Sequence, residues 1–424
     1  MYGSLIQGND GGLYGTTGFG GANGAGTIFK ISQRGTLTTL HTFCAQSGCT
    51  DGAVPYAGLL QTQNGNFYGT TYEGGSALGY GTVFELGSNG LFSILRPFCS
   101  ETNCADGLWP AEPLIQASNR DLYGVAFSEL YQLTPAGVFS NPPVATGIKQ
   151  MIQATDGNFY GVGTGSTHLY AIIEVTKAGQ LLTLYSFCQV KGCPDGTEPT
   201  ALMQAADGTF YGATSSGGTY DAGTVFQFNS VTGQFRTVYS FCSQFNCADG
   251  AVPYAGLIQG TDGNFYGTAS GGGTAGAGTV FQITPGGQLT TLHVFCLQGG
   301  ACSDGADPLG ALVQATDGNF YGTTYGSQSQ CPKNCGTVFQ ISTGLRPFVR
   351  ANPGFAQVGR VVNILGNNLA STTGVSFNGV QAAYRVMSNT YIEAQVPSGA
   401  TTGMIQVMTT GGTLSSDVAF QVLP

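Results

Sequence analysis

The sequence has 424 residues, of which 42% are hydrophobic and 11% aromatic, enough apolar material for a large core. Only 8% are charged, against roughly 25% in an average soluble domain. The net charge of −9, with 13 Lys and Arg, argues against nucleic acid or an anionic membrane as a partner. Because short apolar runs recur between 69 glycines, the composition indicates many short strands joined by turns rather than a disordered chain.

One motif, Asp-Gly-Asn-Phe-Tyr-Gly at residues 262–267, recurs seven times with small changes. Its copies are marked by Tyr14, Tyr68, Tyr123, Tyr160, Tyr211, Tyr266 and Tyr321. These tyrosines are separated by 54, 55, 37, 51, 55 and 55 residues. A fixed period of this size indicates a repeat architecture with one shortened unit.

Each unit predicts four short antiparallel strands. In the unit that begins at Pro253, an Asp-Gly turn and a glycine-rich loop separate runs of β-prone residues. The predicted strands are residues 254–259, 264–268, 279–283 and 288–295. Four strands per unit, repeated seven times, predict an all-β fold in which residues 1–342 form a seven-bladed β-propeller of four-stranded antiparallel blades.

The last unit reaches residues 337–341 and then has no recognisable fourth strand. The last blade is therefore expected to be three-stranded, unless another segment completes it. An incomplete blade leaves an edge that a neighbouring chain or the C-terminal domain could pair.

The 12 cysteines fall into six close pairs, five of them at the same place in the repeat. Such spacing favours local disulfides in an oxidising compartment over free buried thiols or a zinc site, because zinc needs two close pairs brought together. The predicted pairs are Cys44 with Cys49, Cys99 with Cys104, Cys188 with Cys193, Cys242 with Cys247, Cys296 with Cys302, and Cys331 with Cys335.

Residues 345–424 carry neither repeat nor cysteine. Five runs in this part alternate apolar and polar residues as the strands of a sandwich do, among them residues 360–366 and 403–408. About 80 residues of this kind predict a small immunoglobulin-like domain.

Two resemblances follow from these motifs. The recurring Leu-Ile-Gln-x-x-Asp-Gly-Asn-Phe-Tyr-Gly-Thr-Thr resembles the GloVer tandem repeat of bacterial extracellular proteins over residues 1–342. The segments 361–369, 375–379 and 396–403 resemble an IPT/TIG immunoglobulin-like domain. The first resemblance implies secretion or surface exposure without implying a reaction, and the second implies a structural or partner-binding domain.

We therefore expect an extracellular or cell-surface bacterial protein. No signal peptide is visible after Met1, and no run of 18 apolar residues predicts insertion into a membrane. The paired cysteines and the missing signal are reconciled most simply by a truncated or processed N-terminus.

The glycine-rich and cysteine loops are predicted to share one face of the propeller, since they follow alternate strands. The residue before the loop proline varies between units, whereas the glycines and aromatic strand residues barely change. The residue before the loop proline is Val54, Trp109, Glu198, Val252 or Asp307, depending on the unit. We expect ligand binding at this rim by Trp109, Tyr56 and Tyr254; the alternative is that Trp109 only packs on its neighbouring loop.

Three carboxylates near the start of the first strands, Glu112, Glu198 and Asp307, are candidates for the central channel. The other repeated acids fit Asp-Gly turns, and a calcium-loop ligand series is absent. His41 and His293 share a strand-four position with Tyr185, Tyr239 and Arg96, which indicates packing or surface exposure rather than catalysis.

The sequence predicts a noncatalytic binding or scaffold protein that recognises an extracellular glycan, matrix polymer or protein, with no cofactor and no metal. One alternative is a glycoside hydrolase or lyase that uses the channel carboxylates, which needs two of them roughly 5–10 Å apart. The other is a self-assembling structural protein that associates through the edge of the seventh blade or through the C-terminal domain.

Overall fold

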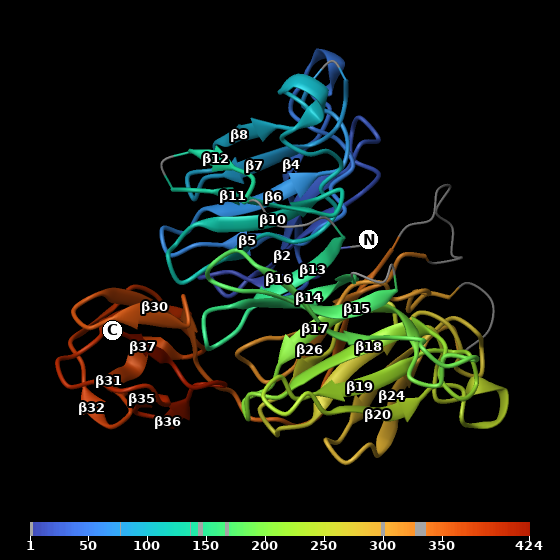
Figure 1. Ribbon diagram of the computed structural model, residues 1–424. Coiled ribbons are helices and arrows are strands. Elements are labelled where there is room, and N and C mark those ends of the chain that lie inside the picture. The colour runs from blue at the N-terminus through green and yellow to red at the C-terminus, as the bar shows by residue number, and fades with distance from the viewer. Residues whose placement is uncertain are drawn as a thin grey trace.

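Figure 1 shows the computed structural model of the chain, an all-β protein whose strands are mostly short. The structure describes residues 3–76, 78–135, 137–142, 147–165, 169–297, 302–326 and 336–424. No helix in these ranges is long and apolar enough to cross a membrane. The helical segments within these ranges are single 3-10 turns: Ser47–Cys49, Thr102–Cys104, Phe245–Cys247 and Leu369–Ser371.

The repeats fold into antiparallel sheets, each made of consecutive strands in chain order. Sheet 1 is β1 (Ile6–Gln7), β2 (Leu13–Thr17), β3 (Thr27–Ile31) and β4 (Leu37–Thr42). Sheet 2 is β5 (Leu60–Gln61), β6 (Phe67–Thr71), β7 (Thr82–Leu86) and β8 (Phe92–Pro97). Sheet 3 is β9 (Ile115–Gln116), β10 (Leu122–Ala126), β11 (Glu129–Leu133) and β12 (Phe139–Ser140). Sheet 4 is β13 (Ile148–Gln153), β14 (Phe159–Thr164), β15 (Tyr170–Val175) and β16 (Leu181–Ser186).

The remaining repeats continue this pattern. Sheet 5 is β17 (Thr197–Gln204), β18 (Phe210–Ser216), β19 (Thr224–Phe228) and β20 (Phe235–Ser240). Sheet 6 is β21 (Ile258–Gln259), β22 (Phe265–Ala269), β23 (Thr279–Ile283) and β24 (Leu289–Val294). Sheet 7 has three strands among the described residues: β25 (Val313–Gln314), β26 (Phe320–Thr323) and β27 (Val338–Ile341).

Aromatic rings from the repeated motif hold neighbouring sheets together. The motif tyrosine of one sheet lies against the motif phenylalanine of the next, with ring centroids 4.0 Å apart for both Tyr211–Phe265 and Tyr266–Phe320. In four repeats the tyrosine also ties down its own turn: the hydroxyls of Tyr14, Tyr160, Tyr266 and Tyr321 each donate a hydrogen bond to the turn aspartate, at 2.9 Å for Tyr266 and Asp262. The motif therefore packs one sheet on another, as its aromatic composition predicts.

The sheets form a closed ring, because sheet 7 packs on sheet 1. Leu5, Leu13 and Phe29 of the first repeat share a core cluster with Val313 and Tyr321 of the last. A glutamine, called here the clasp glutamine, recurs at the end of each first strand, and six of the seven accept a backbone hydrogen bond from the preceding sheet. Gln259 Oε1 accepts a hydrogen bond from the Ala206 backbone N–H of the preceding sheet at 2.9 Å. At the ring closure Gln7 accepts one from Thr316 N, also at 2.9 Å.

The C-terminal residues fold around a core of their own. One sheet joins β28 (Arg350–Asn352), β30 (Val361–Leu365), β34 (Tyr391–Gln395) and β33 (Tyr384–Val386). The other joins β32 (Val380–Gln381), β31 (Thr372–Phe377), β35 (Ile405–Thr409) and β36 (Gly412–Ser415). A parallel pair, β29 (Phe355–Gln357) and β37 (Gln421–Leu423), completes this C-terminal module. Both four-stranded sheets contribute to one cluster, with Ile364, Ile392, Val375 and Val407 fully buried.

The C-terminal module, orange to red in Figure 1, docks on the face of the ring that carries the Asp-Gly turns. Asn363 donates a hydrogen bond to the Gln63 carbonyl at 2.9 Å, and Gln421 donates one to the Thr155 carbonyl at 3.0 Å. These contacts reach the turns of sheets 2 and 4. One residue spans the closure of the ring, because Asn367 donates to Thr316 Oγ1 at 2.9 Å and accepts from Gln33 Nε2 at 3.0 Å.

We predict that Asn367→Ala weakens the ring at its closure. The substitution removes two side-chain hydrogen bonds, each contributing about 0.5–1.5 kcal/mol, so the unfolding free energy is expected to fall by about 1–3 kcal/mol. Thermal and urea unfolding measure this loss. The matched control is Gln381→Ala, an exposed amide on the other sheet of the module, and an equal loss in both variants would contradict the bridging role of Asn367.

Candidate functional site

The cysteine loops are closed by disulfides. The structure contains Cys44–Cys49, Cys99–Cys104, Cys188–Cys193, Cys242–Cys247 and Cys296–Cys302, as the spacing predicts. Five disulfides indicate an oxidising, extracellular environment.

The sixth predicted disulfide is not among these five. It would join Cys331 to Cys335, and both Cys331 and Cys335 lie outside the described residues. The pairing of Cys331 with Cys335 therefore stays a prediction from their spacing alone.

Among the described residues, three cysteine loops, those that end at Cys49, Cys193 and Cys247, are each tied to the glycine-rich loop of the neighbouring repeat. Gly75 N donates a hydrogen bond to the Cys49 carbonyl at 2.9 Å, and Gly273 N donates one to the Cys247 carbonyl at 2.8 Å. The two loop types therefore share one face of the ring, as the alternation of strand direction predicts.

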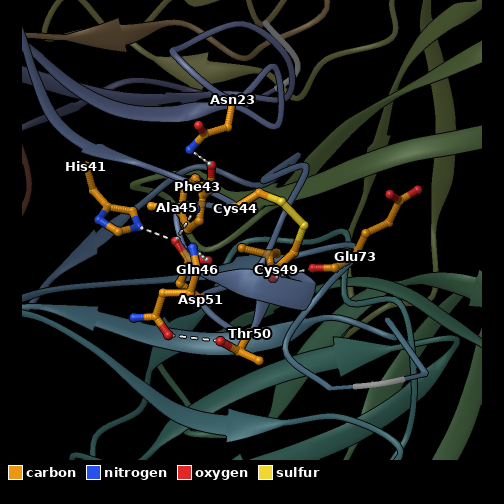
Figure 2. Close-up of a disulfide and its surroundings, with 11 residues drawn as sticks. Asn23, His41, Phe43, Cys44, Ala45, Gln46, Cys49, Thr50, Asp51 and Glu73 are labelled. Atoms are coloured by element: carbon orange, nitrogen blue, oxygen red, sulfur yellow. Dashed lines mark hydrogen bonds and ion pairs between the residues drawn. A yellow bond between two sulfur atoms is a disulfide. The ribbon is translucent and has the colours of Figure 1, made fainter.

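The aspartate after the second cysteine organises each loop. Figure 2 shows Asp51 beside the Cys44–Cys49 disulfide, where it accepts the Ala45 backbone N–H at 3.1 Å, with His41 Nε2 lying 3.3 Å from it. In another repeat the buried Asp249 accepts from Ser243 N at 2.9 Å and from the Tyr239 hydroxyl at 2.8 Å. These carboxylates are engaged in holding the loops.

This geometry explains the variable strand-four position. The side chain at this position directs a polar atom toward the loop aspartate of its own repeat in five repeats, where it is His41, Arg96, Tyr185, Tyr239 or His293. The residue types look unrelated in sequence, but each can donate a hydrogen bond to a carboxylate. The sequence predicted only packing or surface exposure at this position. The structure adds that the side chain at this position supports the disulfide loop.

The residue before each loop proline adopts a strained backbone conformation. The φ angles are 56° at Val54, 51° at Trp109, 54° at Glu198, 56° at Val252 and 53° at Asp307. The left-handed region is costly for residues with a Cβ, above all for β-branched valine. Contacts with the previous sheet hold it, since Trp109 N donates to the Tyr80 carbonyl at 2.8 Å. The following proline fits only because the facing residue is glycine: a Cβ on Gly81 would lie 2.8 Å from Pro110 Cδ.

Aromatic side chains form a continuous row on this face. Ring centroids are 6.3 Å apart for Phe19–Tyr56, 5.2 Å for Tyr56–Tyr72, 6.1 Å for Tyr72–Trp109 and 5.7 Å for Trp109–Phe127. The row crosses three neighbouring sheets. Its two ends, Phe19 and Phe127, are 54% and 65% exposed, so they offer apolar surface to solvent.

The aromatic row borders a central cavity of about 700 Å³. Every sheet of the ring contributes to the wall, near the start of its first strand. Contributing residues, in chain order, are Ser4, Tyr56, Glu112, Lys149, Thr200, Tyr254 and Leu309. A side pocket of about 270 Å³ between sheets 3 and 4 shares Glu112 and Lys149 with the cavity and is also lined by Trp109, Phe127 and Tyr170.

The predicted site residues divide into two groups. Tyr56, Tyr254 and Glu112 line the central cavity, and Trp109 lines the side pocket that adjoins it. Glu198 and Asp307 are exposed and do not belong to either lining. Glu198 instead accepts a hydrogen bond from Ser215 Oγ at 3.0 Å.

Glu112 has the electrostatic environment of a functional group. Burial raises its pKa from 4.5 to about 7, while the nearby positive charge of Lys149 lowers it. Such a carboxyl group is poised between its neutral and charged forms near neutral pH. No cluster of three or more His, Cys, Asp or Glu able to hold a metal ion occurs in the described part of the chain.

Sequence reasoning missed Lys149 and three members of the aromatic row, Phe19, Tyr72 and Phe127. For Lys149, Tyr72 and Phe127 a signal was present in the internal repeats. Three residues after the motif tyrosine-glycine pair, Tyr72, Phe127 and Tyr325 stand where other units have glycine, serine or threonine. Four residues before the clasp glutamine, Glu112 and Lys149 replace glycine, alanine or threonine.

The comparisons identify the repeat. A family model described as the Gloeobacter/Verrucomicrobia repeat matches residues 1–139 and 147–386. The chain belongs to this family. The resemblance to the GloVer repeat is thereby confirmed, and the match extends beyond residue 342 into the C-terminal module. No curated protein matches the chain.

Members of other families share the fold of this repeat protein. A streptogramin B lyase superposes with a TM-score of 0.51 at 15% identity, over 80% of this chain and 93% of the lyase. A fungal alcohol oxidase of the AA5 family, in complex with copper, superposes with a TM-score of 0.55 at 11% identity, over 99% of this chain and 96% of the oxidase. At these identities the likeness concerns the propeller-like fold alone.

We predict that Glu112 makes stability depend on pH. Its folded-state pKa is raised, so the folded protein holds this proton more tightly than the unfolded chain, and stability falls as pH rises from 4.5 through about 7. Glu112→Gln, which mimics the neutral form, should unfold at a higher temperature than wild type at pH 8.5 and at nearly the same temperature at pH 4.

The second variant, Lys149→Met, removes the charge that stabilises the Glu112 carboxylate, so the decline should move to higher pH. Thermal unfolding between pH 4 and 9 measures both effects. A wild-type profile unchanged by Glu112→Gln would contradict the raised pKa.

Proposed function

We propose that this repeat protein is a noncatalytic, extracellular or cell-surface binding protein of bacteria that captures a glycan at the mouth of its central cavity. In this proposal residues 1–342 are a seven-bladed β-propeller and residues 345–424 an IPT/TIG immunoglobulin-like domain. The observation that carries the proposal is the aromatic row from Phe19 to Phe127 beside the cavity.

Aromatic rings suit sugars because both present flat apolar faces. A sugar ring exposes C–H groups on one face, and stacking them on an indole or phenol ring removes apolar surface from water without burying the hydroxyl groups. Rings spaced along a row can hold successive sugar units. The disulfide loops and clasped sheets keep the row in place before binding, which lowers the entropy cost of engaging a polymer.

The hydrolase or lyase alternative has less support. A glycosidase of the common kind needs two carboxyl groups on either side of one sugar bond. Of the three candidates, only Glu112 lines the cavity, whereas Glu198 accepts a hydrogen bond from Ser215 outside it. One carboxyl group beside a cation fits recognition of a ligand better than hydrolysis of it.

We predict that Trp109→Ala weakens glycan binding by roughly tenfold or more, through loss of its stacking surface. A glycan array followed by titration calorimetry on the strongest hit measures the change. Trp109→Phe keeps an aromatic ring and should retain part of the affinity. The matched control is Phe245→Ala on a cysteine loop, where an 88% exposed ring lies outside the cavity lining. An identical profile for wild type and Trp109→Ala would overturn the proposal.

The second candidate function is self-association through sheet 7. Within the described residues β27 pairs only with β26, so its other edge lacks a partner strand. In sheet 6 the matching residues Val280, Phe281 and Ile283 have no exposed surface, whereas Val338, Phe339 and Ile341 are partly exposed. Apolar residues on an unpaired edge favour pairing with another strand.

We predict that Gln340→Pro abolishes such association. Gln282 of sheet 6 is the equivalent of Gln340 and pairs with Thr290 of the fourth strand. This pair lies two residues from the hydrogen-bonded Thr284–Gln288 pair, and hydrogen-bonded pairs recur every second residue in an antiparallel ladder. The backbone N–H of Gln340 is therefore expected to point toward the position of a fourth strand. Proline removes that donor, while Gln340→Ala keeps it. Analytical ultracentrifugation should show concentration-dependent dimers for wild type and Gln340→Ala only. Monomers at every concentration of wild type would exclude this function.

A further inference from the structure

Glu112 and Lys149 break the repeat pattern at one place in the ring. Four residues before the clasp glutamine, the other repeats carry Gly3, Ala57, Thr200, Ala255 and Gly310. Small side chains at this position leave the cavity open. Two neighbouring sheets, 3 and 4, carry charged side chains there instead, and both of these side chains line the central cavity and the side pocket.

Lys149 is available to a ligand. Its Nζ atom lies 3.4 Å from the Pro199 carbonyl oxygen, which occupies one of the three donor positions of an ammonium group. Lys30, Arg96 and Arg350 each form an ion pair with a carboxylate, but within the described ranges Lys149 forms none. In a chain of net charge −9, it is the one basic residue in either lining.

We propose that the side pocket binds a sugar that carries a carboxylate, a uronic acid unit of an acidic polysaccharide. This inference rests on the glycan-binding function proposed above and specifies its ligand class. The sugar carboxylate accepts hydrogen bonds from Lys149 Nζ, the ring stacks on Trp109 or Phe127, and Glu112 contacts the hydroxyl groups. Together the pocket and the adjoining cavity have the volume of an ordinary ligand site.

Glu112 gives this recognition a pH dependence. While its carboxyl group is neutral it donates or accepts hydrogen bonds, and the lining carries the net positive charge of Lys149. Above its raised pKa of about 7 it becomes a second anion facing the ligand and competes for Lys149. The other titratable groups in the two linings are the phenols Tyr56, Tyr72, Tyr123, Tyr170 and Tyr254.

The test uses a galacturonic acid trimer and its methyl ester, which share shape and hydroxyl groups but differ in charge. Titration calorimetry with the full chain at pH 6 and pH 8 measures both. We expect the acid to bind roughly tenfold tighter than the ester at pH 6, and this preference to shrink severalfold at pH 8 as Glu112 ionises. The acid itself is ionised at both pH values, since carboxyl groups of this kind titrate near 3–4.

Three variants separate the contributions. Lys149→Met should remove the preference for the acid, whereas Lys149→Arg, which retains the charge, should keep most of it. Glu112→Gln should keep the preference and remove its pH dependence. Circular dichroism and thermal unfolding establish that each variant is folded before binding is compared.

The possible failures are distinguishable. Equal binding of acid and ester, with both weakened by Trp109→Ala, would overturn this inference and leave the glycan-binding function standing. No binding of either trimer would also overturn it, and the glycan array with Trp109→Ala would then decide the proposed function independently. If the Lys149→Met variant still prefers the acid, another group binds the sugar carboxylate, and the role proposed for Lys149 is overturned.

Discussion

Stacking of one repeat on the next is the interaction on which the whole structure depends. A single four-stranded sheet of this chain has large apolar residues on both faces, so it cannot be stable in water by itself. The motif tyrosine of each sheet meets the motif position of the next, as in Tyr14–Phe67 at 4.3 Å. Fully buried phenylalanines that directly follow the fourth strands add a second contact, as in Phe241–Phe281 at 5.1 Å. Burial on both faces is complete only when the last sheet reaches the first.

Ring closure then creates the site. Because the first strands lie nearest the centre, the residues just before them or at their beginning surround a cavity to which every sheet contributes. Small residues at those positions keep the cavity open. The few large or charged exceptions, such as Tyr56, Glu112 and Lys149, supply the side chains that can contact a ligand there. Backbone hydrogen bonds to the preceding repeat hold the strained conformation at Trp109 and at its equivalents Val54, Val252 and Asp307, so contacts between neighbouring repeats also orient the rim.

The two faces of the ring have different roles. On the turn face, polar side chains of the C-terminal module contact backbone carbonyls of sheets 1, 2, 4 and 7. On the loop face, disulfides and buried aspartates such as Asp249 stabilise loops too rich in glycine to be rigid by themselves. Because the module occupies the turn face, the aromatic row on the loop face is left accessible to a polymer.

The sequence by itself determined the repeat, its strands, the local cysteine pairs of five repeats and the variable positions, because these depend on contacts between residues close in the chain. Asp-Gly turns, alternating strands and cysteines five or six residues apart each specify a local geometry. Comparison between repeats also singled out Trp109, Tyr56 and Glu112. Only the tertiary structure decided which variable residues meet. Lys149 of sheet 4 approaches Glu112 of the neighbouring sheet 3, whereas Glu198 and Asp307 stay outside the cavity. Which side chains come together depends on how the sheets are tilted and stacked around the ring, and the local sequence does not specify this.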